Sequence, residues 1–445
     1  MILRSGAAVV CVVLLGTLVP GPAAGGEAPP GAARAAAGPF RMVSVSDRGR
    51  PADDHVFGGA VSRDGRLVAF TSGAENLDRR TRGGYPQVFV RDARTGRVRA
   101  VGADRRGRLA RSAEGVDLSP NGRFVAFSSP DDLVGQDVDG VGDEHADVFV
   151  RDLRTGRVRR ASTAAGGGMA DGASTNPVVA DNGDVVFTSA ATDLVAGDAN
   201  AVHDYFLFDW GTRRVRRLAT AEIARASVRI SGDGAVVAVV TTEVLAGRDS
   251  GTLPDLYVLR RRGASGGTWS MPLAQPTGLP TDTGCGWTGL SVSHSGRYLT
   301  AGCADGGVAS PPVADKPVHL WWVDRRSGMV RLVNRTDDIA SEVNAAQVSD
   351  DGRRVFFAGQ ERAWSRTASP ARAAQPYEGV FLWERGSVRQ LTRGYDAWWD
   401  SSGFDAAGDG RTVAFTSLSP AMAGRDADDD VHQALYVRRV GARSR

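Results

Sequence analysis

The stretch VSRDGRLVAFTS at residues 61–72 decides the fold, because the chain repeats its pattern seven times. Each copy places a Gly-containing turn between an apolar run and a run of β-branched and aromatic residues, which is typical of a β-hairpin. The turn glycine is expected at positive φ, which glycine adopts without steric cost. The other copies are LSPNGRFVAFSS (118–129), VADNGDVVFTS (179–189), ISGDGAVVAVVTT (230–242), VSHSGRYLTAGC (292–303), VSDDGRRVFFAG (348–359) and AAGDGRTVAFTS (406–417).

A second hairpin pattern follows most copies. VFVRDARTGRVRAV (88–101) and VFVRDLRTGRVRRA (148–161) are nearly the same sequence, and the stretches at 206–218, 320–333 and 380–391 are looser versions. Each period therefore holds two hairpins, or four strands. Four strands repeated seven times without helical periodicity predict an all-β, seven-bladed β-propeller of four-stranded antiparallel blades.

The two ends of the repeat region fit each other. The seventh copy stops after its third strand, ALYVRRV at 434–440, while FRMVSV at 40–45 reads as a strand with no blade before it. We therefore expect the N-terminal strand to complete the last blade and close the ring, so that the propeller occupies residues 40–445.

The repeated S-x-D/N-G-R-x-V-A-F-x-S, followed by D-V-F-V-R-D-x-x-T-G, resembles the WD-like repeats of the TolB-type propeller family. The resemblance covers residues 40 to 440, and it is weakest at 260–269 and around the cysteines. It implies a propeller fold and an extracytoplasmic role in binding a protein or another ligand. It implies no reaction, because propellers host many functions.

The N-terminus is typical of a secretory signal. Arg4 precedes an apolar run at 7–19, and small residues follow at 23–25, so residues 1–25 are interpreted as a signal peptide and 26–39 as a flexible linker. An uncleaved membrane anchor is the alternative. No later apolar stretch approaches membrane length, so we expect a secreted or extracytoplasmic mature chain without a membrane span.

The composition argues against a strong overall electrostatic field. The chain has 54 Lys and Arg against 51 Asp and Glu, a net charge of +3, so no nucleic-acid partner is expected. The arginines are scattered along the strands, and we interpret them as solvated faces rather than a polybasic patch. We expect a monomer.

Two cysteines remain after export of the mature chain. Cys285 and Cys303 flank a predicted hairpin, and a disulfide is the default in an oxidising compartment. A reactive thiol or a metal pair is the alternative.

An acidic sequence pattern recurs in the long loops between the second and third strands. Oxygen ligands at such spacing can surround Ca²⁺, although Asx side chains also simply cap turns. The candidate Ca²⁺ ligands are Asp137, Asp139, Asp143, Asp198, Asn200 and Asp204.

Aromatic residues in the loops of three consecutive copies are candidates for a ligand-binding surface. Flat rings with polar neighbours suit stacking on sugars or holding a peptide, and the alternative is that they fill gaps between blades. The candidates are Trp287, Trp364, Tyr377, Tyr395, Trp398 and Trp399.

The sequence contains no G-x-S-x-G, no phosphate-binding G-x-x-x-x-G-K-[ST] and no H-E-x-x-H. The leading hypothesis is therefore a non-catalytic extracytoplasmic binding scaffold that recognises a protein or glycan partner on the long-loop face, without a cofactor other than Ca²⁺. The alternative is a secreted polysaccharide lyase or glycoside hydrolase that uses loop carboxylates such as Asp137, Asp396 or Asp400. A structural component of the cell envelope is the third possibility.

Overall fold

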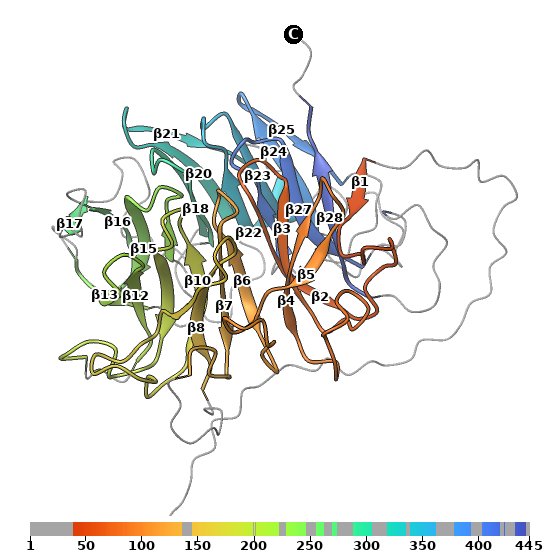
Figure 1. Cartoon of the computed structure of the whole chain (residues 1–445). Helices are drawn as coiled ribbons and strands as arrows, with labels where there is room; N and C mark the ends of the chain where they lie inside the picture. The colour runs from red at the N-terminus through yellow and green to blue at the C-terminus, as the bar shows by residue number, and fades with distance from the viewer. Residues whose placement is uncertain are drawn as a thin grey trace, which may run out of the picture. The chain divides into compact units, whose positions relative to one another are not determined.

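The computed structural model describes residues 39–135, 145–198, 200, 202–221, 228–245, 255–261, 269–273, 288–304, 318–334, 339–361, 378–392, 403–418, 422 and 432–441. These residues lie in one compact unit, Ala37–Arg445, and form seven four-stranded sheets (Figure 1). None of the described residues belongs to a helix of the length and hydropathy that crossing a bilayer requires.

Each sheet is antiparallel and follows the chain order, and we number the blades 1 to 7 from the sheet that begins with β2. The first strands are β2 (Val56–Val61), β6 (Glu114–Leu118), β10 (Ser174–Val179), β14 (Val228–Ile230), β18 (Thr288–Val292), β22 (Ile339–Val348) and β26 (Asp405–Ala406). The second strands are β3 (Leu67–Ser72), β7 (Phe124–Ser129), β11 (Val185–Ser189), β15 (Val236–Thr241), β19 (Tyr298–Ala304), β23 (Arg354–Glu361) and β27 (Thr412–Ser417). The third strands are β4 (Gln87–Asp92), β8 (Asp147–Asp152), β12 (Asp204–Asp209), β16 (Asp255–Arg261), β20 (Val318–Asp324), β24 (Glu378–Glu384) and β28 (Ala434–Arg439). The fourth strands are β5 (Val98–Ala100), β9 (Val158–Arg160), β13 (Arg214–Thr220), β17 (Trp269–Leu273), β21 (Met329–Leu332), β25 (Ser387–Gln390) and, in blade 7, β1 (Phe40–Met42).

The blades form a ring. Each first strand contacts the first strands of the two neighbouring blades, and β26 contacts β2. A cluster of buried apolar side chains fills each of the seven spaces between consecutive blades. The predicted all-β propeller of seven four-stranded blades is confirmed.

Blade 7 contains strands from both ends of the described chain, in the order β1-β28-β27-β26. β1 runs antiparallel to β28, with Phe40 opposite Arg438 and Met42 opposite Tyr436. The Phe40 ring packs edge-on against Phe415 with ring centroids 5.5 Å apart. This pairing makes the N-terminal strand a candidate support for the ring.

The turn glycines have two physical reasons to be glycine. All seven adopt positive φ, between 67° and 87°, which a side chain tolerates poorly. Each also touches the preceding blade: a Cβ on Gly352 would lie 2.5 Å from Cδ1 of Tyr298, and one on Gly65 would collide with Thr412. The same closeness joins Gly122 to Leu67, Gly183 to Phe124, Gly234 to Asn182, Gly296 to Val236 and Gly410 to Ser349.

Hydrogen bonds connect these turns around the whole ring, one junction after another. All seven junctions use a backbone N–H of the turn as the donor. The acceptor is a backbone carbonyl at five junctions and a carboxylate, of Asp181 or Asp350, at the other two. The bonds run from Arg63 N to Pro120 O (2.7 Å), Asn121 N to Asp181 Oδ1 (2.7 Å), Asp181 N to Gly232 O (2.8 Å), Asp233 N to His294 O (2.9 Å), His294 N to Asp350 Oδ1 (3.0 Å), Asp350 N to Gly408 O (2.8 Å) and Asp409 N to Arg63 O (3.0 Å).

Gly352→Ala is expected to destabilise the protein more than Gly49→Ala. Both glycines have positive φ, but nothing lies within 4 Å of a Cβ at Gly49. Both substitutions carry the left-handed backbone strain, roughly 1–2 kcal/mol, and only Gly352→Ala adds the cost of displacing Tyr298, about 1–3 kcal/mol. Urea unfolding of the two variants measures the difference, and equal losses would contradict the close contact between blades.

Phe40→Ala tests whether β1 supports the ring, with Phe57→Ala as its matched control. Phe40 is 6% exposed and Phe57 is 43% exposed. Truncating a packed Phe costs about 3–5 kcal/mol, whereas a surface substitution changes stability by about 0.5 kcal/mol. Thermal and chemical unfolding should separate the two variants clearly, and a Phe40→Ala protein as stable as wild type would exclude β1 from ring closure.

Candidate anion-binding groove

Most of the predicted site residues lie outside the described residues. The aromatic surface and three of the six proposed Ca²⁺ ligands therefore stay predictions, as does the pairing of Cys303 with Cys285. The residues concerned are Trp287, Trp364, Tyr377, Tyr395, Trp398, Trp399, Asp137, Asp139, Asp143 and Cys285. Cys303 itself is buried in the cluster between blades 4 and 5.

Of the three described Ca²⁺ candidates, Asp204 pairs with an arginine and Asn200 bonds to Asp204. Arg217 Nε donates to Asp204 Oδ2 at 2.6 Å, and Asn200 Nδ2 donates to the same carboxylate at 3.0 Å. Burial, and then the charge of Asp204, raises the pKa of Asp198. The Arg217 guanidinium neutralises Asp204 at the place where a bound cation would act. No group of three His, Cys, Asp or Glu side chains within the described ranges is arranged to hold a metal ion, and Ca²⁺ binding stays a prediction.

The repeat arginines were interpreted as solvated faces, and the Arg that follows the turn glycine is indeed partly exposed in blades 1, 2 and 5, but it also has a partner within its blade. This Arg forms an ion pair with the acidic residue that ends the third strand of the same blade, so it joins the two hairpins. The Arg66 guanidinium holds the pKa of Asp92 at about 2. The pairs are Arg66–Asp92 (2.7 Å), Arg123–Asp152 (2.7 Å) and Arg297–Asp324 (2.8 Å). In blade 6 the second residue after the glycine forms the corresponding pair, Arg354–Glu384 (2.8 Å).

In blade 3 an aspartate takes the place of this arginine, and blade 4 supplies the positive charge. Asp184 occupies the position of the arginine in blade 3. Arg261 of blade 4 reaches both Asp184, at 2.7 Å, and Asp209, at 2.5 Å. The two carboxylates of blade 3 are therefore neutralised by the neighbouring blade.

The arginine of the V-R-D motif joins one blade to the one before it. Arg151 donates to the carbonyl oxygen of Ala103 at 2.5 Å. Arg91 likewise donates to Val45 O, and Arg438 to Leu391 O. Each acceptor lies just after the outer strand of the preceding blade, so these arginines also serve the fold.

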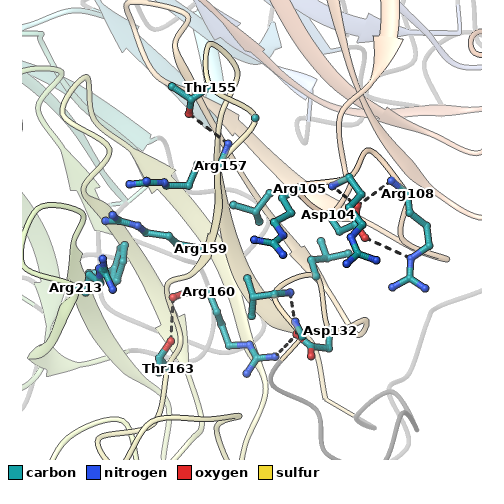
Figure 2. Close-up of a pocket in the computed structure, with 17 residues that line it drawn as sticks. Asp104, Arg105, Arg108, Asp132, Thr155, Arg157, Arg159, Arg160, Thr163 and Arg213 are labelled. Carbon is teal, nitrogen blue, oxygen red and sulfur yellow. Dashed lines mark hydrogen bonds and ion pairs between the residues drawn. The ribbon is translucent and has the colours of Figure 1, made fainter.

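A third set of arginines lines a groove at the outer edge of blade 2, which we call the rim groove. Its volume is about 1080 Å³, and seven of its lining residues are arginines against two aspartates. Figure 2 shows them around β9 and the adjoining turn. The charged residues of the rim groove are Asp104, Arg105, Arg106, Arg108, Asp132, Arg157, Arg159, Arg160 and Arg213.

The two aspartates of the rim groove are already paired. Asp132 accepts from Arg160 at 3.0 Å, and Asp104 lies 3.4 Å from Arg108. The other five arginines make no ion pair with any residue that the structure describes. They are Arg105, Arg106, Arg157, Arg159 and Arg213.

Local structure concentrates this positive charge. The Arg159 guanidinium lies 4.0 Å from the centroid of the Trp210 ring and donates to Trp210 O. Burial, and then the neighbouring charges of Arg213 and Arg157, lowers the pKa of Arg159. Arg213 sits at φ 62°, and buried Phe208 contributes an apolar part of the wall. Guanidinium groups in such a recess favour a carboxylate, sulfate or phosphate group.

The prediction that the chain has no polybasic patch is wrong at this place. The rim groove draws Arg105 from the link before blade 2, Arg157 from the outer hairpin of blade 2 and Arg213 from blade 3. Each segment carries a short run of arginines (105–108, 157–160 and 213–217), but the runs lie far apart in the sequence, and only the packing of the blades brings them together.

Polar side chains also face neighbouring blades on the inner strands. Three of them, five residues before the turn glycine, accept a hydrogen bond from a backbone N–H of the next blade. The bonds are Asp405 Oδ2 to Val61 N (2.7 Å), Asp117 Oδ2 to Val179 N (2.7 Å) and Ser291 Oγ to Val348 N (3.1 Å).

The pKa values of two of these acceptors are strongly raised. Burial raises the pKa of Asp117 to about 6 and that of Asp405 to about 7, with the charge of Asp117 contributing to the second shift. Asp405 also accepts from Gln347 Nε2 at 2.6 Å. Asp405 therefore links blade 7 to blades 1 and 6, and its bonds account for it as a structural connection. An alignment of the seven copies would reveal the polar residues of this position.

Comparisons with known proteins give the fold. No protein-family model matches the chain, and no curated protein matches it. An oligogalacturonate lyase from Vibrio parahaemolyticus is 11% identical with a TM-score of 0.53, over 90% of this chain and 96% of that one. The β-propeller domain of the Trilobed protease from Pyrococcus furiosus is 13% identical with a TM-score of 0.50, over 86% and 95%. TolB from Acinetobacter baumannii is 17% identical with a TM-score of 0.33, over 62% and 53%. The similarity to the lyase and to the protease domain is one of fold.

Asp405→Asn should change how stability depends on pH. Because folding raises the pKa of Asp405 from 3.8 to about 7, its protonated form contributes stability below pH 4, and this contribution is lost as pH rises through 7. Asn cannot ionise, so the variant should gain stability relative to wild type between pH 5 and pH 8. Urea unfolding across this range tests the sign, with pH 4.5 as the internal reference. A difference that does not grow with pH would contradict the assignment.

Proposed function

We propose that this protein is a non-catalytic, extracytoplasmic binding scaffold that holds an anionic part of a protein or glycan partner in the rim groove. The observation that carries the proposal is the surplus of positive charge there. Five of the seven arginines have no carboxylate partner among the described residues, and both aspartates of the groove are already neutralised.

Physical chemistry supports an anion as the ligand. A guanidinium presents a planar set of donors that matches carboxylate, sulfate and phosphate oxygens. The ring of Trp210 shields the Arg159 guanidinium from part of the water around it, which strengthens its charge-assisted hydrogen bonds. Arg105, Arg157 and Arg213 are exposed and accessible to a ligand. The whole chain carries a net charge of only +3, so attraction is local to the groove and not a property of the whole surface.

The extracytoplasmic location follows from the expected signal peptide at residues 1–25 and belongs to the proposal. An anionic polysaccharide or the acidic segment of another exported protein is the kind of ligand that such a location offers.

A secreted lyase or hydrolase is the second candidate. The specific observation in its favour is the raised pKa of Asp117 and Asp405, about 6 and about 7, because acid–base catalysis uses groups that titrate near neutrality. The loop carboxylates first considered, Asp137, Asp396 and Asp400, lie outside the described residues. Turnover of acidic polysaccharides that disappears in Asp405→Asn, while the variant stays folded, would favour this candidate.

The double variant Arg157→Gln/Arg213→Gln tests the proposed function. Its matched control is Arg48→Gln/Arg353→Gln, which removes the same charge from exposed positions outside the groove. Binding of poly-L-glutamate and of heparin is measured by titration calorimetry in low salt. The groove variant should bind about tenfold to a hundredfold more weakly, and the affinity of wild type should fall as salt rises.

Equal affinities of the groove variant and the control would overturn the proposal, because the groove would then contribute no more than any exposed arginines. A failure of every anionic probe to bind wild type at low salt would overturn it as well.

A further inference from the structure

The outer strand of blade 2, β9, borders the rim groove. Among the described residues, no further strand pairs with its outer edge. β9 is the last strand in the order β6-β7-β8-β9. The ladder bonds from Asp152 N to Arg157 O and from Ala161 N to Val148 O direct residues 157 and 161 toward β8. Because antiparallel bonds alternate along a strand, the N–H and C=O of Val158 between them point outward. Val158 itself lines the groove.

Blade 1 shows what covers the equivalent edge. There the amide of Val98, which matches Val158 in the repeat, donates to Asp47 Oδ1 at 2.7 Å. Asp47 belongs to a tight turn in the link before blade 1, closed by the bonds from Ser46 N to Arg50 O and from Gly49 N to Ser46 O. A carboxylate of the protein itself therefore satisfies the outward N–H of this outer strand.

Blade 2 replaces that carboxylate with an arginine. The link before blade 2 forms the same turn, closed from Asp104 N to Arg108 O and from Gly107 N to Asp104 O. Aligning the two turns on these bonds places Arg105 at the position of Asp47. A guanidinium has no acceptor to offer an N–H, and no side chain among the described residues takes the place of Asp47 on Val158.

The arginines stand on both sides of β9. Arg159 is on the side of blade 3, over Trp210 and near Arg213, while Arg160 is on the other side, paired with Asp132. Figure 2 shows Arg105 between the Asp104 turn and β9, across the strand from Arg157, Arg159 and Arg213. Side chains of an added strand alternate between two faces, so an extended chain beside β9 meets positive charge on each face.

We propose that the rim groove binds an acidic segment of a partner protein in extended conformation, which adds to blade 2 as a further strand beside β9. This inference rests on the proposed function of the groove and specifies its ligand. The segment's backbone exchanges hydrogen bonds with Val158, and its carboxylates lie against Arg105 on one face and Arg157 and Arg213 on the other. It supplies the acceptor that Asp47 supplies in blade 1.

Charge complementarity and an open strand edge together favour a polypeptide over a polysaccharide. A uronate chain offers carboxylates to the arginines, but it lacks the regular N–H and C=O spacing that pairs with an edge strand. A polysaccharide occupant is therefore an outcome that the test must be able to return.

The first experiment uses the wild-type protein and needs no variant that must fold. A fluorescent peptide of eight Glu residues, which presents carboxylates on both faces when extended, is compared with two versions, one N-methylated at every odd-numbered residue and one at every even-numbered residue. Fluorescence anisotropy measures the affinities. In one of the two versions the methyl groups face β9, and that version should bind at least about tenfold more weakly than the parent, while the other stays close to it. Equal affinities of all three peptides, or a uronate octasaccharide that binds as tightly as the parent, would overturn the inference.

The second experiment gives blade 2 the carboxylate that accepts the outward N–H in blade 1. Arg105→Asp places a carboxylate at the position of Asp47, and Arg106→Asp makes the same charge change at the neighbouring exposed position. Arg105→Asp should weaken the peptide at least about tenfold more than Arg106→Asp does. It should also protect the Val158 amide from hydrogen exchange without ligand, whereas wild type gains this protection only with the peptide.

The two failures can be told apart. If Arg105→Asp and Arg106→Asp weaken the peptide equally while Arg157→Gln/Arg213→Gln still weakens it strongly, the strand-addition inference fails and the anion-binding function stands. If Arg157→Gln/Arg213→Gln has no effect, the proposed function fails first.

Discussion

The close contact between each turn glycine and the preceding blade is the constraint on which the structure depends. At Gly352 the room for a side chain is taken by Tyr298 of the blade before it, and the same is true at the other turns. This closeness lets backbone N–H groups reach the next turn and hydrogen-bond around the entire ring. A repeat unit cannot bury its apolar face alone, so the turns position the blades for the seven apolar clusters that lie between them.

Once the blades are fixed, two sets of described arginines hold them together. The arginine after the turn glycine joins the two hairpins of a blade, as Arg66 does with Asp92. The arginine of the third strand binds a carbonyl of the preceding blade, as Arg151 does with Ala103. An ion pair or a hydrogen bond satisfies each of these charges locally. The rim groove differs because its arginines outnumber its carboxylates, and a charge surplus of this kind is what a binding site requires.

The comparison of blades 1 and 2 isolates the feature that distinguishes the site. The two blades have nearly the same sequence in the second hairpin, and the links before them form the same turn. One substitution within this shared geometry, Arg105 in place of Asp47, removes a cap and adds a positive charge. Blade 1 thus serves as an internal reference for blade 2. Because the turn forms with Asp47 in one link and with Arg105 in the other, the fold does not require Arg105.

The sequence predicted the elements that local patterns determine. The glycine turns, the two hairpins of each period and the number of blades are visible because tight turns need glycine at positive φ and strands need β-branched and aromatic residues. The rim groove escaped prediction because Arg105, Arg157 and Arg213 come together only through the packing of two blades and a link. The role of Arg105 was also hidden by the unequal lengths of the two links. Asp47 lies 18 residues before Gly65, whereas Arg105 lies 17 residues before Gly122, so the two match only when the turn bonds of the links are aligned. The aromatic surface from Trp287 to Trp399 lies outside the described residues, and its test requires ligand binding rather than geometry.

Arginine footprinting tests the central claim most directly. Phenylglyoxal modifies accessible guanidinium groups, and mass spectrometry with and without poly-L-glutamate locates those that the ligand covers. The account predicts protection at Arg105, Arg157 and Arg213, with Arg48 and Arg353 equally reactive in both samples. Protection spread evenly over exposed arginines, or confined to positions outside the rim groove, would contradict it.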